Sequence, residues 1–264
     1  MTPPPLASFC FRFHFRCEIS LATYGSVECV AENYNREESS KESSVEGKHG
    51  LETSNDIDPV AFWTFDDVPN SNVASDTAGK TNGLYSAGVD LGHEGQTSKQ
   101  SSAYFNGESS YVVIPYTPLL NSADFTISAT VNPSARSGED QSESAESIVE
   151  NFAETSEQTV VIGGYGLERH WIGPNEKGAY EPKWAFAIGT PLGPRVIYSK
   201  SKARSDEWSQ IVGVYDTVER RMSLFVNGKL EASETLGNQV NVASLSKDFP
   251  LLLLFYLPID FPFL

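Results

Sequence analysis

The chain is poor in cysteine, and none of its three cysteines lies where a core can form. Cys10, Cys17 and Cys29 all precede the apolar part of the sequence, and their spacing fits no zinc-binding pattern. The 264 residues allow one large all-β domain with tails or two small domains, and the core-forming residues lie mainly between 60 and 242. A domain of that size buries roughly 70% of its unfolded surface. We therefore expect a core that needs no disulfide.

Positive charge is also scarce. The chain has 19 Lys and Arg residues against 35 Asp and Glu residues, which gives a net charge of −16. Phosphate recognition and binding to anionic membranes both need clustered basic residues. We therefore expect no nucleic-acid partner. Much of the acid lies in two polar stretches, residues 32–56 and 139–157, which we interpret as solvated segments.

Neither end of the chain has the pattern of a targeting or membrane segment. A secretory signal has basic charge followed by about 7 to 15 apolar residues, whereas Arg12, His14 and Arg16 interrupt the N-terminal apolar residues. We expect residues 1–57 to be a low-complexity or disordered segment. The apolar tail of residues 244–264 contains three prolines, which disrupt helices. A membrane helix needs about 20 apolar residues, so we expect no membrane span.

Helical periodicity is missing between residues 58 and 243, where the pattern is one of short strands. Asn106-Gly107 and Asn227-Gly228 are turn signals, and Pro133 is expected to stop a strand. The strands expected from apolar runs and alternation are residues 60–65, 103–105, 111–114, 125–131, 159–162, 184–188, 195–198, 208–215, 222–226 and 229–231. We predict an all-β, antiparallel two-sheet jelly-roll sandwich. Met222, Leu224 and Val226 are expected to face its core.

Four segments, in order, resemble the laminin G-like jelly rolls of the concanavalin A-like lectin/glucanase superfamily. They read AFWTFD followed by VASDTAGKTNG, AYFNG leading to YVVIP, FTISATVNP, and WSQIVGVYD followed by MSLFVNG. The resemblance implies one domain over residues 58–243 and an extracellular or cell-surface location. It implies no single ligand, because the superfamily hosts lectins, glycosidases and adhesion modules.

The resemblance stops at the C-terminal end. Such domains usually continue past the Asn-Gly hairpin with two further strands, the second similar to Ile-Asp-Glu-Val. Here only Ile259-Asp260 matches part of that second strand. The sandwich is therefore expected to lack its C-terminal strands, through truncation or a frame shift near Ser244, unless the apolar tail of residues 244–264 substitutes for them. A missing strand would expose a sheet edge.

Paired catalytic acids are also missing from the predicted strands. The glucanases of this superfamily place acids at alternate positions of one strand, where they share a face and can stand about 5 to 5.5 Å apart. Glu139, Asp140 and Glu143 have the wrong spacing and lie in a polar loop, and Asp206-Glu207 has no alternating partner. We predict that the chain is not an enzyme. The alternative, a glycoside hydrolase or lyase, needs an acid pair that this pattern does not reveal.

A calcium site is the better hypothesis, since lectin-like members of the superfamily often bind calcium and this ion takes six to eight oxygen ligands. The candidate ligands are Asp66, Asp67, Asp76 and Asn82. The alternative is that Asp76-x-x-Gly79 is simply a turn, because Asp and Gly are common turn residues.

Sugar binding needs exposed aromatic rings, and the candidates in loops are Trp171, Tyr180 and Tyr198. The other three tryptophans are expected to pack in the core or on a sheet face, and His170 is interpreted as a solvated loop residue. The leading hypothesis is a non-catalytic, lectin-like module for carbohydrate or an extracellular protein partner, with calcium as an optional aid. A structural remnant without activity is a third alternative.

Overall fold

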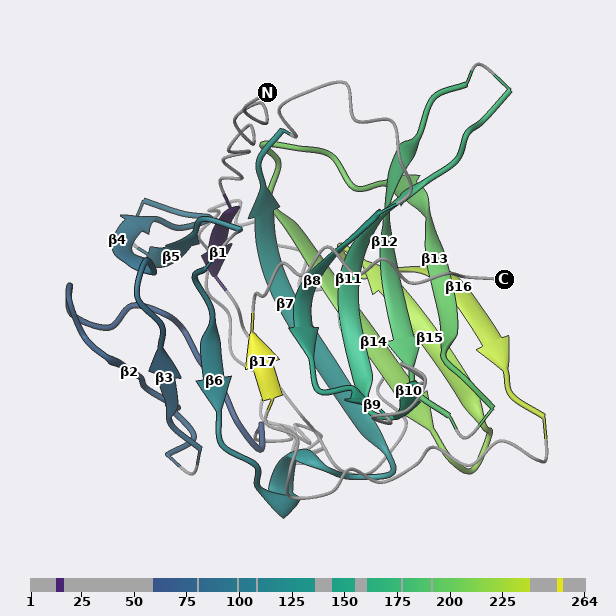
Figure 1. The fold of residues 1–264 in the computed structure, drawn as a ribbon, viewed down its shortest axis with the longest axis horizontal. Coiled ribbons are helices and arrows are strands. Elements are labelled where there is room, and N and C mark those ends of the chain that lie inside the picture. Colours follow the sequence, from purple (N-terminus) through teal and green to yellow (C-terminus); the bar gives the residue numbers. More distant parts are fainter. Residues whose placement is uncertain are drawn as a thin grey trace, which may run out of the picture.

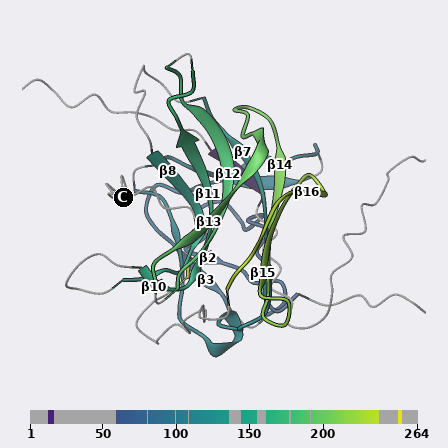
Figure 2. The ribbon, with the colours of Figure 1, turned by 90° about the vertical axis from the view of Figure 1, so that its right-hand side faces the viewer.

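A computed structural model describes residues 13–16, 59–79, 81–98, 100–107, 109–135, 144–154, 161–176, 178–190, 192–237 and 251–253. These residues form two large antiparallel sheets that pack face to face (Figures 1 and 2). The described residues contain one short 3-10 turn, Pro118–Leu120, and no α-helix. The prediction of an all-β, two-sheet sandwich is confirmed.

One sheet has seven strands in the order β16-β15-β14-β7-β1-β5-β4. Its strands are β1 (Phe13–Arg16), β4 (Asp90–Glu94), β5 (Ser101–Phe105), β7 (Phe125–Pro133), β14 (Ser209–Asp216), β15 (Arg221–Val226) and β16 (Lys229–Thr235). Strand β1 comes from the segment of residues 1–57 that was predicted to be disordered, and it lies between β7 and β5.

The other sheet has eight strands in the order β13-β12-β11-β8-β17-β6-β3-β2. Its strands are β2 (Val73–Ala74), β3 (Gly83–Tyr85), β6 (Val112–Ile114), β8 (Ser144–Glu150), β11 (Tyr165–Ile172), β12 (Glu181–Ile188), β13 (Arg195–Lys202) and β17 (Leu251–Leu253). A separate two-stranded sheet joins β9 (Ala153–Glu154) to β10 (Val161–Gly163).

The core lies between the two large sheets and follows the alternation of their strands. Met222 and Leu224 are 0% exposed and Val226 is 6% exposed, so the predicted inner face of residues 222–226 is confirmed. The sheets approach closely at Gly213, where an added Cβ would lie 2.5 Å from the Phe186 ring. Burial of apolar area is the main stabilising contribution here, at about 1.5 to 3 kcal/mol for each large side chain.

The start of the sandwich differs from the prediction. Residues 60–65 form no strand, and Trp63 makes only an isolated bridge to Asp76. Phe65 has a φ of 55°, a left-handed conformation that interrupts an extended strand. The turn at Asn106-Gly107 exists, with a φ of 73° at Gly107. It does not join a hairpin, because β5 and β6 belong to different sheets.

The C-terminal tail supplies a strand. Leu251 and Leu253 of β17 pair with Ile114 and Val112 of β6, and Leu252 pairs with Glu150 of β8. Of the alternatives for this segment, the structure shows the one in which the apolar tail substitutes for a missing strand. A short continuous apolar run is compatible with a buried central strand and with an irregular apolar tail. Periodicity alone therefore does not distinguish these two structures. Residues 254–264, which include the partial match at Ile259-Asp260, lie outside the described residues.

The acidic stretch of residues 139–157 is not wholly solvated, as the sequence had suggested. Strand β8 lies within it, and its Glu146 and Glu150 are 4% and 8% exposed. Both carboxylates have partners: Arg169 contacts Glu146, and Ser147 donates to Glu150. Charged groups are buried in proteins when they are paired in this way.

Candidate functional site

Asp76, the centre of the predicted calcium site, organises a turn. Its Oδ1 accepts hydrogen bonds from the backbone N–H groups of Phe62 (2.8 Å) and Ala78 (2.9 Å). Its Oδ2 accepts from the N–H and the hydroxyl of Thr81, both at 2.8 Å. The Gly79 N–H donates to the Asp76 carbonyl at 2.8 Å, with a φ of 80° at Gly79. This is the turn that was the alternative interpretation of Asp76-x-x-Gly79.

The other predicted calcium ligands are also engaged. Asn82 Oδ1 accepts from the Asp76 N–H at 2.9 Å, so these two residues are brought together. Asp67 accepts from the Tyr85 hydroxyl at 2.7 Å, and Asp66 accepts from the hydroxyl of Thr64. Burial, with the hydrogen bond to Asp67, raises the pKa of Tyr85 far above its ordinary value.

Each of these four side chains has an oxygen that accepts a hydrogen bond from a protein donor. No group of three or more His, Cys, Asp or Glu residues is placed to hold a metal ion anywhere in the described part of the chain. Calcium binding stays a prediction.

The three predicted ligand-binding aromatics do not form one site. Trp171 lies on β11 rather than in a loop, on the face that includes Leu167, and the guanidinium of Arg169 lies 5.1 Å from its ring centroid. Tyr180 directly precedes β12. Tyr198 lies on β13, in register with Ala185, on the outward face of the eight-stranded sheet, and it is 36% exposed.

Tyr198 stands beside a buried carboxylate–imidazole pair. Its ring packs edge-on against His170 of β11, with the ring centroids 5.3 Å apart. His170 Nε2 contacts Glu168 Oε2, and the two residues are 5% and 8% exposed. The interpretation of His170 as a solvated loop residue is therefore wrong. Glu168-x-His170 alternates on one strand, and a prediction of β11 from the sequence would have found the pair.

A second carboxylate shares this face. Glu150 of β8 pairs with Gly166 of β11, and Glu168 pairs with Ser147 of β8. The two carboxylates therefore belong to neighbouring strands at diagonal positions, where Cβ atoms stand roughly 7 to 8 Å apart or somewhat less. A search for acids on a single strand missed the pair for this reason. We call Ser147, Glu150, Glu168, His170 and Tyr198 the β8–β13 cluster.

Arg169 points to the opposite side of β11 and fixes the strand from within the sandwich. It is 1% exposed and donates to Glu146 Oε2 (3.2 Å), the Ser134 carbonyl (3.2 Å) and the Ser205 hydroxyl (2.8 Å). Because Ser134 follows β7 and Ser205 precedes β14, one guanidinium links both sheets.

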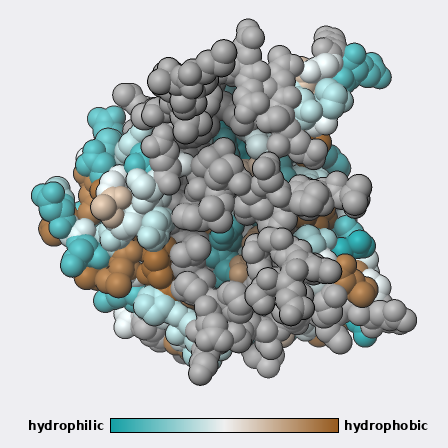
Figure 3. Space-filling view, viewed as in Figure 1, coloured by the Kyte–Doolittle hydropathy of each residue, from teal (hydrophilic) through white to brown (hydrophobic). Residues whose placement is uncertain are grey.

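An apolar surface lies at the other end of the same sheet. Figure 3 shows apolar atoms gathered over β2 and β3, where Leu84 is 54% exposed. Leu84 is in register with Val73 of β2 and Val113 of β6. Exposed apolar surface of this kind often marks an interaction surface. In the described part of the chain, no helix is long and apolar enough to cross a membrane.

On one sheet face, the cluster places a partly exposed aromatic ring near two carboxylates and an imidazole that are at most 8% exposed. No curated protein matches the chain in a sequence comparison. A laminin G family model, described as the concanavalin A-like lectin/glucanases superfamily, matches residues 106–253, which is more than half of the chain. The match begins at the turn after β5 and ends with β17, the last described strand. The chain belongs to the concanavalin A-like lectin/glucanases superfamily.

Proposed function

We propose that this chain is a non-catalytic, extracellular binding module that recognises carbohydrate or a protein partner through the β8–β13 cluster. The observation that carries the proposal is Tyr198, a one-third exposed ring on an outward sheet face. Ligand sites combine an apolar surface with a few fixed polar groups. Here His170 holds the Tyr198 ring edge-on, and Glu168 in turn holds His170.

Binding to a glycan array and to cell surfaces tests the proposal, with and without calcium. We expect Tyr198→Ala to reduce binding by about tenfold, because an aromatic contact of about 1.4 kcal/mol corresponds to that factor. The matched control is Leu192→Ala, which removes an apolar side chain that is 75% exposed in the β12–β13 turn. Absence of any ligand, or equal losses in the two variants, would count against the cluster as the site.

Glycoside hydrolysis is a second candidate function, favoured by the placement of Glu150 and Glu168 on one face of neighbouring strands. A retaining mechanism needs two carboxyl groups about 5 to 5.5 Å apart, and an inverting one about 6.5 to 9.5 Å. In this structure Ser147 donates to Glu150 and His170 contacts Glu168. Because both carboxylates already have protein partners, binding is the function that we favour.

Release of reducing ends from soluble β-glucans measures this second candidate directly. Activity that disappears in both Glu150→Gln and Glu168→Gln, with the melting temperature unchanged, would make the chain an enzyme. Activity that persists in both variants would exclude Glu150 and Glu168 as the catalytic pair. If the wild-type chain has no activity, the binding module remains the favoured function.

A further inference from the structure

Asn-Gly pairs occur three times in the chain, at Asn82-Gly83, Asn106-Gly107 and Asn227-Gly228. Asparagine is a thermolabile residue, and it is most reactive before glycine, because glycine has no Cβ to shield its backbone nitrogen. That nitrogen can attack the preceding side-chain amide and displace ammonia. Whether the reaction occurs in a folded protein depends on how each amide and each glycine is held.

The first pair is held by a strand. Asn82 Oδ1 accepts a hydrogen bond from the Asp76 N–H at 2.9 Å. Gly83 begins β3 and lies in register with Ala74 of β2. An added Cβ at Gly83 would lie 2.4 Å from Ile114 Cδ1, so this glycine is tightly enclosed. The Gly83 nitrogen therefore cannot approach the Asn82 side chain without disrupting the start of β3.

The second pair is held by a network of hydrogen bonds. Asn106 Oδ1 accepts from the Ser109 N–H (3.0 Å), the Ser110 N–H (3.1 Å) and the Ser110 hydroxyl (2.8 Å). Asn106 Nδ2, the nitrogen that would leave as ammonia, donates to the Ser109 hydroxyl at 3.1 Å. Gly107 is buried. This network must break before the amide can react.

The third pair forms the loop of the β15–β16 hairpin, and both of its residues are exposed. The φ angles of 49° at Asn227 and 74° at Gly228 match a type I′ turn. The Asn227 side chain makes one hydrogen bond, in which Oδ1 accepts from the Gln210 N–H at 2.9 Å. Among the described residues, neither Asn227 Nδ2 nor the Gly228 N–H has a protein partner. The leaving group and the attacking nitrogen of this pair are therefore both open to water.

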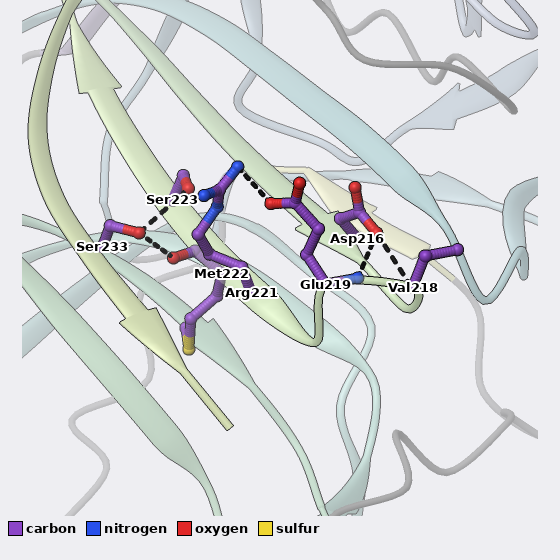
Figure 4. Close-up of polar contacts among 7 residues, drawn as sticks. All are labelled: Asp216, Val218, Glu219, Arg221, Met222, Ser223 and Ser233. Atoms are coloured by element: carbon purple, nitrogen blue, oxygen red, sulfur yellow. Dashed lines mark hydrogen bonds and ion pairs between the residues drawn. The ribbon is translucent and has the colours of Figure 1, made fainter. Parts of the chain in front are cut away.

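The far end of the same hairpin is held independently of this loop, as Figure 4 shows. The Ser233 hydroxyl of β16 donates to the Met222 carbonyl at 3.2 Å and lies 3.3 Å from the Ser223 hydroxyl. Local opening costs less free energy than global unfolding, so the loop can open while these contacts persist. Ring closure needs such an opening, because Asn227 must leave its left-handed conformation to bring its side chain to the Gly228 nitrogen.

We propose that Asn227-Gly228 is a site of spontaneous deamidation and isoaspartate formation, and that the folded structure protects the other two pairs. The Gly228 nitrogen bonds to Asn227 Cγ, and the Cγ–Nδ2 bond breaks. The Gly228 amide proton goes to Nδ2, which leaves as ammonia. Water then opens the cyclic imide: attack at Cγ gives aspartate, and attack at the main-chain carbonyl gives isoaspartate. No residue of the β8–β13 cluster takes part.

The products alter the edge of the seven-stranded sheet. Either product adds a negative charge to the loop. Isoaspartate also carries the main chain through the side-chain methylene, which lengthens the loop between the paired residues Val226 and Lys229. Strand β16 is an edge strand, and its Glu231 accepts from the Ser201 N–H of β13 at 2.8 Å. We expect the modified protein to melt at a lower temperature, because this edge and its link to the other sheet are loosened.

Incubation of the full chain at pH 9, followed by peptide mass mapping and by labelling with an isoaspartyl methyltransferase, tests the proposal. We expect Asn227 to react at least about tenfold faster than Asn82 or Asn106, a factor that corresponds to about 1.4 kcal/mol in the cost of opening. The rate should decrease at pH 6, because the attacking nitrogen must lose its proton. Absence of modification at Asn227, or an equal rate at either of the other pairs, overturns the proposal.

Unfolding and substitution separate the effect of the fold from that of local sequence. In concentrated urea we expect the three pairs to react at similar rates, because glycine is the next residue in each. Selectivity that persists in urea would come from local sequence and would overturn protection by the fold. Asn227→Gly keeps a residue that accepts a positive φ, and it should remove most of the isoaspartate labelling of the incubated protein. Labelling that is unchanged in this variant would place the reaction elsewhere and overturn the proposal.

Discussion

Arg169 and Glu146 form an ion pair inside the sandwich, with Arg169 Nη1 3.2 Å from Glu146 Oε2 and side chains that are 1% and 5% exposed. Removal of one partner leaves a buried charge, which typically costs about 3 to 5 kcal/mol. We expect Arg169→Met to lower the free energy of unfolding by this amount, as measured by urea denaturation. Arg204→Met is the control, because its ion pair with Glu207 is exposed and contributes about 1 kcal/mol or less. Equal effects in the two variants would contradict the role of Arg169.

Gly213 sets the distance between the sheets. An added Cβ would lie 2.5 Å from the Phe186 ring, so Gly213→Ala should cost about 1 to 3 kcal/mol through overpacking. Gly237→Ala is a matched control, since no atom lies within 4 Å of its added Cβ. Thermal unfolding of the two variants measures the difference. A Gly213→Ala variant as stable as the wild type would show that the sheets can separate at this point.

Asp76 provides a test of calcium binding. If its carboxylate only organises the turn, Asp76→Ala leaves buried N–H groups without an acceptor and lowers stability by about 1 to 3 kcal/mol. We expect that loss to be the same in millimolar calcium and in chelator. A ligand that binds only the native state must raise its stability. If calcium raises the melting temperature of the wild-type protein but not that of Asp76→Ala, the metal binds at this turn.

Alkaline pH should destabilise the protein through Tyr85. Burial and the hydrogen bond to Asp67 raise the pKa of Tyr85 in the folded state. The unfolded phenol ionises near pH 10, so the stability that this group contributes is present below that pH and is lost as pH rises above it. Urea denaturation at pH 8 and pH 11 should show this decrease, and the decrease should be smaller in Tyr85→Phe. An identical decrease in the free energy of unfolding of the two proteins would exclude Tyr85 as the cause.

Alternation of apolar and polar residues predicted two of the long strands well. The segments 125–131 and 222–226 form strands β7 and β15, and Met222 and Leu224 lie in the core as expected. The same signal cannot decide which strands pair. The turn signal at Asn106-Gly107 is one example, because the chain there crosses from one sheet to the other.

The candidate site was predicted less well, because its residues violate the rules by which strands were recognised. Strand β8 carries Glu146 and Glu150 inside an acidic stretch, and β11 contains Glu168, Arg169 and His170 in succession. Arg169 pairs with Glu146 of the neighbouring strand, a tertiary contact that local composition cannot reveal. Glu168 contacts His170 within β11, and Ser147 donates to Glu150 within β8.

Strand β17 is the last described strand to be synthesised, although it lies in the middle of its sheet. Until residues 251–253 have left the ribosome, β6 and β8 each present an unpaired row of backbone groups in the middle of their sheet. Unpaired edges invite association with other chains, and incompletely folded species are aggregation-prone. Between the emergence of β16 and that of β17, the nascent domain therefore carries two unpaired edges that other chains could bind, and a chaperone that covers them would protect it.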